Sequence, residues 1–261
     1  MPIAVRIRKT VNVKLAHPLK TKLIAESKKT DKVDAKVLAD LARTNFLSEA
    51  YLPPDDILEL REIIRERVRL KRLSVSIKNR IHSILTKNGI KIEKPFTKDG
   101  REELRSMGNK WINRYLRILE KIEDEISEID KEIKRICLMN DEISILLTIP
   151  GIGYFSALLI YAEVGDINRF PNSKKLCSYA GLVPTVRQSG NKIIRGRITK
   201  EGNKLLRWVL VQCAHMAVRK DERFKRLEDK TQKGASESNS SYSEKTTNGD
   251  LCMLEEQNSI R

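Results

Sequence analysis

The chain has 261 residues, enough for one large domain or two small ones, and 40% of them are hydrophobic, enough to build a core. Its 51 lysines and arginines exceed its 35 acidic residues, and the net charge of +16 favours a polyanionic partner, with nucleic acid as the first candidate. The scattered cysteines and histidines reveal no zinc site or disulfide framework, and the N-terminus lacks the apolar core of a secretory signal.

Residues 10–17 alternate apolar and polar side chains, a pattern typical of a half-buried strand. One strand cannot form a stable sheet. We therefore expect its partners to come from another chain, or the sequence to begin partway through a domain. A short helix is predicted over Leu23–Glu26.

A helix is predicted to follow Lys28, with an apolar face formed by Val33, Val37, Leu38 and Leu41. Asp31 and Asp34 are three residues apart, which places their β-carbons about 5–6 Å from each other on a helix. Asp34 is in line with the apolar face, so we expect the carboxylates to continue the buried stripe, a placement that suits two ligands of a divalent metal. The alternative is a pair of first-turn acids that complement the helix dipole, with Thr30 or Asp31 as the cap.

Two long helices are predicted after the proline-rich linker at 52–56. Apolar residues recur every three or four positions over 57–90, and again from Trp111 to Cys137. Helices of matching length joined by a short loop should pair as an antiparallel coiled-coil hairpin whose charges face water. We expect this hairpin to be a spacer or a dimerisation arm, without catalytic residues.

The run 143–162 has no charged residue and is long enough to span a bilayer. Pro150, Gly151 and Gly153 in its middle would leave backbone groups unpaired in lipid, so we reject a membrane span. They instead predict two short helices joined by a tight turn, a helix-hairpin-helix-like element. Main-chain amides at such a turn can hold phosphate, and a plain helical hairpin packed in a core fits the spacing equally well. The basic composition favours phosphate binding by Gly151 and Gly153.

A small β-hairpin is predicted where Thr185–Gln188 and Lys192–Ile198 flank Ser189, Gly190 and Asn191. A helix over Lys174–Ala180, capped by Asn172 or Ser173, precedes it. Another helix, from about Asn203 to Arg219, closes the core. Basic residues around the hairpin are candidate contacts for DNA or RNA phosphate: Arg187, Lys192, Arg195, Arg197, Lys200, Lys204 and Arg207. Residues 230–250 have almost no apolar side chains, and the tail 230–261 is expected to be disordered.

Six motifs occur in order along the chain: KTDKVDA at 29–35, TIPGIG at 148–153, RF at 169–170, YAGLVP at 179–184, QSG at 188–190 and GNKLLR at 202–207. The ordered set closely resembles the Asp-Glu-Asp-Asp transposases of prokaryotic insertion sequences, the family numbered one-ten, which includes pilin-gene invertases. The resemblance covers roughly Val11 to Lys230.

The resemblance implies a mainly α protein with four parts. Residues 1–50 would be the remnant of an RNase H-like, resolvase-like α/β domain, 51–140 a coiled-coil linker, 141–229 a C-terminal transposase domain and 230–261 the tail. In that family four acids bind Mg²⁺, and a serine attacks a DNA phosphodiester to give a covalent protein–DNA intermediate. A bridge RNA selects the two DNAs.

On matching positions, Asp31 and Asp34 correspond to the last two acids and Ser189 to the nucleophile. Taken alone, Ser189 is an ordinary turn residue. Neighbouring cations such as Arg187 and Lys192 can neutralise a phosphate, and no base is identifiable beside the serine.

The sequence departs from the family pattern at both ends. The first two acids should precede Val11, where only ten residues stand, and the stretch after Lys233 lacks the expected apolar helix. We therefore expect a truncated DNA transposase or site-specific recombinase of impaired activity, cytoplasmic and nucleoid-associated, that binds DNA and forms a homo-oligomer through the coiled coil. The rival hypothesis is a non-enzymatic nucleic-acid-binding protein that modulates a full-length transposase. A pure scaffold would show no salt-dependent affinity for DNA or RNA.

Overall fold

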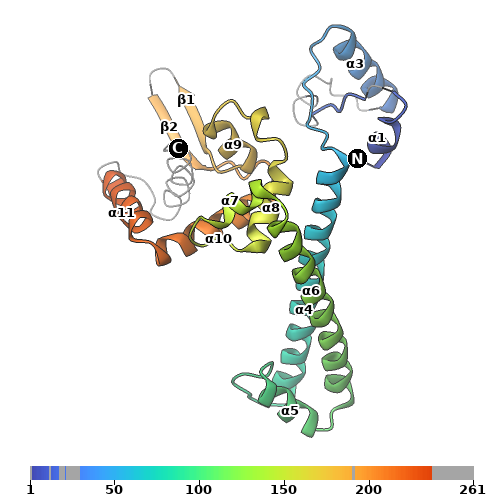
Figure 1. The fold of residues 1–261 in the computed structure, drawn as a ribbon, viewed down its shortest axis with the longest axis vertical. Helices are drawn as coiled ribbons and strands as arrows, with labels where there is room; N and C mark the ends of the chain where they lie inside the picture. The colour runs from blue at the N-terminus through green and yellow to red at the C-terminus, as the bar shows by residue number, and fades with distance from the viewer. Residues whose placement is uncertain (1, 12, 18–20, 22–29, 190–191, 237–261) are drawn as a thin grey trace. The chain divides into compact units, whose positions relative to one another are not determined.

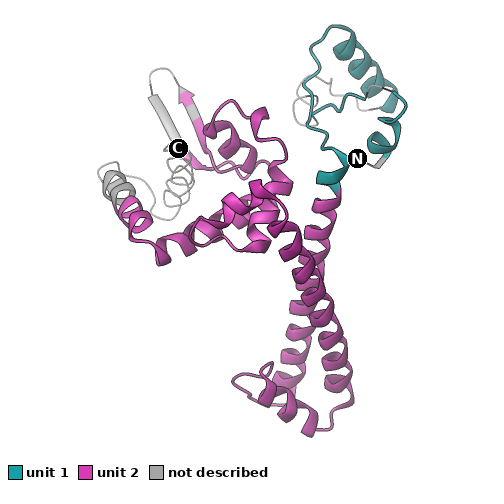
Figure 2. Cartoon of the chain, viewed as in Figure 1, with its two compact units in different colours: residues 1–58 teal, residues 59–261 magenta. Residues whose placement is uncertain are grey.

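The computed structural model describes residues 2–11, 13–17, 21, 30–189 and 192–236. They form helices and one two-stranded sheet, which confirms the prediction of a mainly α protein (Figure 1). The chain divides into two compact units, Met1–Leu58 and Glu59–Arg261 (Figure 2). Within the described ranges, none of the helices combines the length and the apolar character that crossing a membrane requires.

The first unit contains helices α1 (Pro2–Ile7) and α3 (Asp31–Arg43). Among the described residues of the strand predicted over 10–17, the pairing is one antiparallel bridge, between Ala16 and Glu49. The partner segment therefore comes from this chain, and residues 10 and 11 bond back to Ile7 in the turn after α1. The helix predicted over Leu23–Glu26 lies outside the described residues.

A helical hairpin begins the second unit. Helix α4 (Asp55–Lys87) and helix α6 (Lys110–Leu138) pack side by side, and a short helix, α5 (Lys98–Ser106), lies at the closed end (Figure 1). Their shared core is a row of aliphatic side chains at helical spacing, which includes Ile77, Ile81 and Leu85 on α4 and Ile112, Leu116 and Leu119 on α6. The two long helices were predicted, and α5 was not.

The C-terminal part of the second unit is a lobe built around α8 (Tyr154–Val164). This helix is apolar on all sides, so it has to be enclosed. It packs against α6, α7 (Asp141–Leu147) and α10 (Lys204–Lys220). The predicted break at the Pro-Gly sequence is confirmed, because α7 ends at Leu147 and α8 begins at Tyr154.

The rest of the lobe carries the small hairpin. A 3₁₀ turn, η1 (Ile167–Arg169), leads to α9 (Ser173–Ala180), and then β1 (Pro184–Ser189) pairs antiparallel with β2 (Lys192–Ile198). The predicted hairpin is confirmed, as is the predicted cap Asn172, whose side chain accepts a main-chain bond at the start of α9. The side chain of Asn203 does the same at the start of α10. Helix α11 (Glu222–Ser236) extends into the segment predicted to be disordered, and residues 237–261 lie outside the described ranges.

Candidate active site

Ser189 is the last residue of β1, at the turn end of the hairpin; residues 190 and 191 of the turn lie outside the described ranges. The backbone register places Lys192 directly opposite Ser189, and Ile194 opposite Arg187. Residues directly opposite in an antiparallel pair have α-carbons about 4.5–5.5 Å apart. The serine therefore has a lysine as its cross-strand neighbour in the backbone register.

The other end of the hairpin is fastened to the segments on either side of it. Thr199, Lys200 and Asn203 follow β2, and each donates its main-chain N–H to a carbonyl oxygen that precedes β1. The three bonds are Thr199 to Val183 (2.9 Å), Lys200 to Gly181 (3.2 Å) and Asn203 to Tyr179 (3.0 Å). The serine therefore stands on a hairpin whose base is closed by main-chain bonds.

Two glycines allow these segments to approach so closely. Gly181 ends α9 at φ +71°, and a Cβ there would collide with the carbonyl oxygen of Glu201. Gly202, at φ +119°, is crowded in the same way by a carbonyl of α9. Arg207 was predicted to contact nucleic acid, but it is half-buried and its Nη1 donates to the carbonyl oxygen of Ala180 (2.9 Å) across the same seam.

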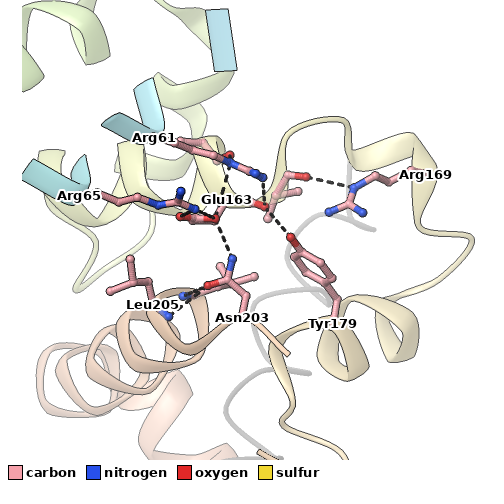
Figure 3. A network of polar contacts seen from close by, with 10 residues as sticks. Arg61, Arg65, Glu163, Arg169, Tyr179, Asn203 and Leu205 are labelled. Atoms are coloured by element: carbon pink, nitrogen blue, oxygen red, sulfur yellow. Dashed lines mark hydrogen bonds and ion pairs between the residues drawn. The ribbon is translucent and has the colours of Figure 1, made fainter. Parts of the chain in front are cut away.

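A buried carboxylate lies beneath this base. Glu163 lies near the end of α8 (Figure 3). Its side chain is 1% exposed. Its Oε1 is 3.0 Å from Nη2 of Arg65, and its Oε2 accepts a 2.7 Å hydrogen bond from Nδ2 of Asn203. Arg61 is also buried; its Nε is 3.5 Å from Oε2 and donates to the carbonyl oxygen of Ala162 (2.7 Å). We call these four side chains, of Glu163, Arg61, Arg65 and Asn203, the Glu163 cluster.

The Glu163 cluster joins three helices and reaches both sides of the hairpin. Asn203 holds the carboxylate with its Nδ2, while its Oδ1 caps α10 by accepting from the N–H groups of Leu205 and Leu206 (both 3.1 Å). On the other side, the hydroxyl of Tyr179 donates to the carbonyl oxygen of Glu163 (3.3 Å). Tyr179, which precedes the hairpin, and Asn203, which follows it, are therefore both hydrogen-bonded to Glu163 (Figure 3).

Arg169 supports Tyr179 from the opposite side. Its Nε donates to the carbonyl oxygen of Val164 (3.2 Å), and its guanidinium carbon lies 4.1 Å from the ring centroid of Phe170 and 4.5 Å from that of Tyr179. Cation–π contacts of this kind fix a planar side chain against an aromatic ring. The Arg-Phe pair of the sequence motif thus helps to hold the start of the hairpin.

The turn between α7 and α8 contains two predicted phosphate contacts, Gly151 and Gly153, which have different surroundings. At Gly151 (φ +93°) a Cβ would lie 2.8 Å from the main-chain nitrogen of Ala217, so packing against α10 requires a glycine there. Gly153 is the N-cap of α8, is exposed, and supplies no side-chain capping bond. Packing therefore accounts for Gly151, whereas Gly153 leaves the start of α8 open to an anion.

Three of the predicted cationic contacts have described, exposed side chains: Arg197 near the end of β2, Lys200 after it and Lys204 at the start of α10. Arg187, Lys192 and Arg195 lie within the two strands. The cysteines Cys137 and Cys213 are not rival nucleophiles, because burial raises the pKa of both thiols, that of Cys137 to about 11.

Asp31 and Asp34 lie in the first turn of α3, in the first unit. Thr30 caps this helix, accepting from the N–H of Val33 at 3.4 Å, as one interpretation of the sequence predicted. Both carboxylates are exposed, and α3 has no buried residue, so the prediction that Asp34 continues a buried stripe is wrong. The reason is that the apolar face of α3 is only half covered; Leu38, for example, is 37% exposed.

The two aspartates fit a magnesium site of the open kind. Mg²⁺ prefers hard oxygen ligands and is usually held by one or two carboxylates, with water completing its coordination. Asp31 and Asp34 offer two exposed carboxylates about one helical turn apart. Among the described residues, no three or more histidine, cysteine or acidic side chains gather as metal ligands would.

Sequence reasoning missed the Glu163 cluster. The one available signal was that Glu163 directly follows the uncharged run 143–162, so its carboxylate had to enter the core with its helix. Its arginine partners stand about a hundred residues earlier, and helical periodicity within α4 gave no reason to pair them with it.

Two family models match parts of this chain. The sequence model described as "Transposase IS116/IS110/IS902 family" matches residues 143–228, and a second, described as "Transposase" and named for DEDD enzymes of IS110, matches residues 1–89. The transposase for insertion sequence element IS1111A of Coxiella burnetii is 28% identical over 219 residues, which cover 80% of this chain and 60% of the relative.

Two further relatives extend the comparison. The transposase for insertion sequence element IS1328 of Yersinia enterocolitica is 29% identical over 80% of this chain and 65% of its own length. The pilin gene-inverting protein of Moraxella bovis is 38% identical over 96 residues, 35% of this chain and 30% of its own. The chain thus spans less than two thirds of the length of each of these relatives.

Proposed function

Because the chain belongs to the IS116/IS110/IS902 family of insertion-sequence transposases, we propose that it binds DNA of its own mobile element and cleaves it with Ser189 as the nucleophile. The observation that carries this proposal is the placement of Ser189. It stands at the free end of a hairpin, opposite Lys192, while the base of the hairpin is fixed by the Glu163 cluster. A hairpin with a fixed base can present a side chain to a phosphodiester in one orientation, which lowers the entropy cost of the reaction.

The chemistry we propose is a transesterification. Oγ of Ser189 attacks phosphorus and gives up its proton, a serine–phosphate ester bond forms, and the bond from phosphorus to one deoxyribose oxygen breaks. The released sugar hydroxyl takes a proton, and reversal of the step with another hydroxyl joins strands without an external energy source. Exposed Arg197, Lys200 and Lys204 would hold the flanking phosphates, and the open start of α8 at Gly153 would accept another.

Asp31 and Asp34 would hold Mg²⁺, which when bound supplies positive charge to the phosphate that is cleaved. The two carboxylates themselves raise the local concentration of the cation and compensate its charge.

The further partners we propose are a bridge RNA and a second copy of this chain. A positively charged chain suits both DNA and RNA. Exposed apolar side chains on the α4–α6 hairpin, such as Leu73, Trp111 and Ile118, provide a surface on which two coiled-coil arms can pair. A protein that acts on chromosomal DNA works in the cytoplasm at the nucleoid. Impaired activity stays a prediction, tested by the cleavage rate of the wild-type chain.

Replacing Asp34 with asparagine should slow cleavage by roughly 100-fold or more, because a neutral amide binds Mg²⁺ more weakly than a carboxylate. The measurement is cleavage of labelled DNA that carries the element's ends, across a magnesium titration. Asp40→Asn is the matched control, since Asp40 is an exposed acid of the same helix. Equal cleavage rates for Asp34→Asn and Asp40→Asn would show that Asp34 is not a metal ligand. Salt-dependent binding without cleavage by the wild-type chain would favour the non-enzymatic binding role.

A further inference from the structure

The first half of α6 carries four cations on one face. Lys110, Arg114, Arg117 and Lys121 follow one another at intervals of four, three and four residues, the spacing of neighbours on a helix surface. All four are exposed, and the side chains that α6 buries in the hairpin core, such as Leu116 and Leu119, lie on the opposite face. We call these four residues the α6 stripe.

The α6 stripe differs from some other cations of the hairpin in its ion-pair partners. Some other cations of the hairpin pair with acids: Lys78 and Arg101 both pair with Glu123, at 2.9 and 2.6 Å. Within the described part of the chain, no ion pair involves a residue of the α6 stripe. The guanidinium of Arg114 instead lies 5.1 Å from the ring centroid of Trp111, which restrains it while leaving its donors open.

Helix stability does not explain this placement. The first turn of α6 has no acidic residue, and its first residue is Lys110. Cations near a helix N-terminus oppose the macrodipole, so acids there would be the stabilising choice. At Lys110, a residue selected for helix stability would therefore carry the opposite charge.

The geometry of the α6 stripe suits a nucleic-acid backbone. From Lys110 to Lys121 the helix rises about 16 Å, at about 1.5 Å per residue. One strand of duplex DNA carries a phosphate about every 3.4 Å along the axis, so the stripe extends along roughly five phosphates. Four cations along such a length match a polyanion whose charges are regularly spaced.

A second copy of this chain is the competing occupant. The same face of α6 continues into acids, including Asp124, Glu128 and Glu132, so two antiparallel copies would place opposite charges together. The exposed apolar residues Trp111 and Ile118 lie beside that face, however, and its centre is charged. Stable protein interfaces deplete charged residues from their centre, and exposed ion pairs contribute little. The observations therefore favour a polyanion.

We propose that the α6 stripe is a contact surface for the phosphate backbone of duplex nucleic acid, either DNA or an RNA stem, in addition to the contacts around Ser189. The proposal rests on the proposed function only in that the chain binds nucleic acid. The acidic second half of α6 repels the same backbone, so the contact is confined to the half of the helix nearer the closed end of the hairpin.

The test compares two triple variants of the full chain. Arg114→Gln/Arg117→Gln/Lys121→Gln removes three charges from the α6 stripe, and Lys131→Gln/Lys134→Gln/Arg135→Gln removes three exposed charges from the same helix. Binding to a labelled DNA duplex and to an RNA duplex of the same sequence is measured by fluorescence anisotropy across a salt series. The slope of log affinity against log salt should fall by about 2–3 for the stripe variant, at about 0.9 per lost contact, and by less than about 1 for the control.

Each outcome of this test either supports or overturns the proposal. A smaller salt slope for the stripe variant with DNA alone, or with RNA alone, supports the proposal and identifies which nucleic acid supplies the phosphates. Equal slopes for the two variants overturn it, because then only net charge matters. A dimer that the stripe variant dissociates in sedimentation, with an unchanged slope, assigns the stripe to a second copy instead. If Lys200→Gln/Lys204→Gln lowers the slope while the stripe variant does not, the inference falls and the proposed function stands; if the wild-type chain binds neither duplex, both fall.

Discussion

Replacing Glu163 with alanine should lower the free energy of unfolding of the C-terminal lobe by about 3–5 kcal/mol, because the change leaves a buried guanidinium without its counter-charge. Arg61, with a 7% exposed side chain, would keep its main-chain bonds but lose the carboxylate. Asn203 would lose the acceptor of its Nδ2 as well. The cost is therefore that of an uncompensated buried charge and not of one lost surface pair.

Urea denaturation followed by circular dichroism measures this cost. Glu132→Ala is the matched control, since Glu132 is an exposed glutamate of α6, and we expect it to change stability by less than about 0.5 kcal/mol. Arg65→Ala should cost less than Glu163→Ala, because the side chain of Arg65 is 41% exposed and water can replace its partner. Comparable losses for Glu163→Ala and Glu132→Ala would contradict the view that the cluster holds the hairpin.

Replacing Ser189 with alanine should reduce DNA cleavage by about a thousandfold or more, since no other atom of the side chain can form the phosphate ester. Affinity for DNA should stay within about twofold, because phosphate contacts come from the cations and not from the hydroxyl. Cleavage of end-containing DNA and anisotropy with the same DNA measure the two effects. Ser178→Ala, an exposed serine on α9, is the control and should match the wild-type rate. Retained cleavage by Ser189→Ala would exclude this serine as the nucleophile.

Elements with strong local signals could be predicted from the sequence. Pro150 and the glycines that follow it predicted the break between α7 and α8. Asn172 and Asn203 lie at the predicted starts of α9 and α10. The turn residues after Ser189 separated two short strands that pair as expected. In each case a side chain or backbone restriction acts on neighbours within a few residues, so the pattern is visible without knowledge of the fold.

Helix α5 and the bridge at Ala16 depended on distant partners. Helix α5 buries only Gly100 and Leu104, too few for a periodic pattern, and it is held by ion pairs such as that between Arg101 and Glu123 of α6. The extended residues before His17 could be recognised, but their pairing with residues 48–50 could not.

The site, too, was predicted only in part, because some of its residues are brought together by contacts between distant segments. Resemblance supplied Ser189, Asp31 and Asp34, whereas the carboxylate beneath the hairpin required knowing that α4 passes beside the end of α8. Asp34 was expected to be buried because periodicity shows which residues share a face, and not how well that face is covered.

The most direct test of the central claim is to map the covalent link between protein and DNA. Wild-type chain is incubated with DNA carrying its element's ends and Mg²⁺, the reaction is stopped in denaturant, and the trapped adduct is digested and sequenced by mass spectrometry. We predict a nucleotide joined through phosphate to Ser189, and no adduct from Ser189→Ala. A nucleotide attached to a different residue, or strand breaks that form without any adduct, would contradict the assignment of the hairpin as the site of strand cleavage.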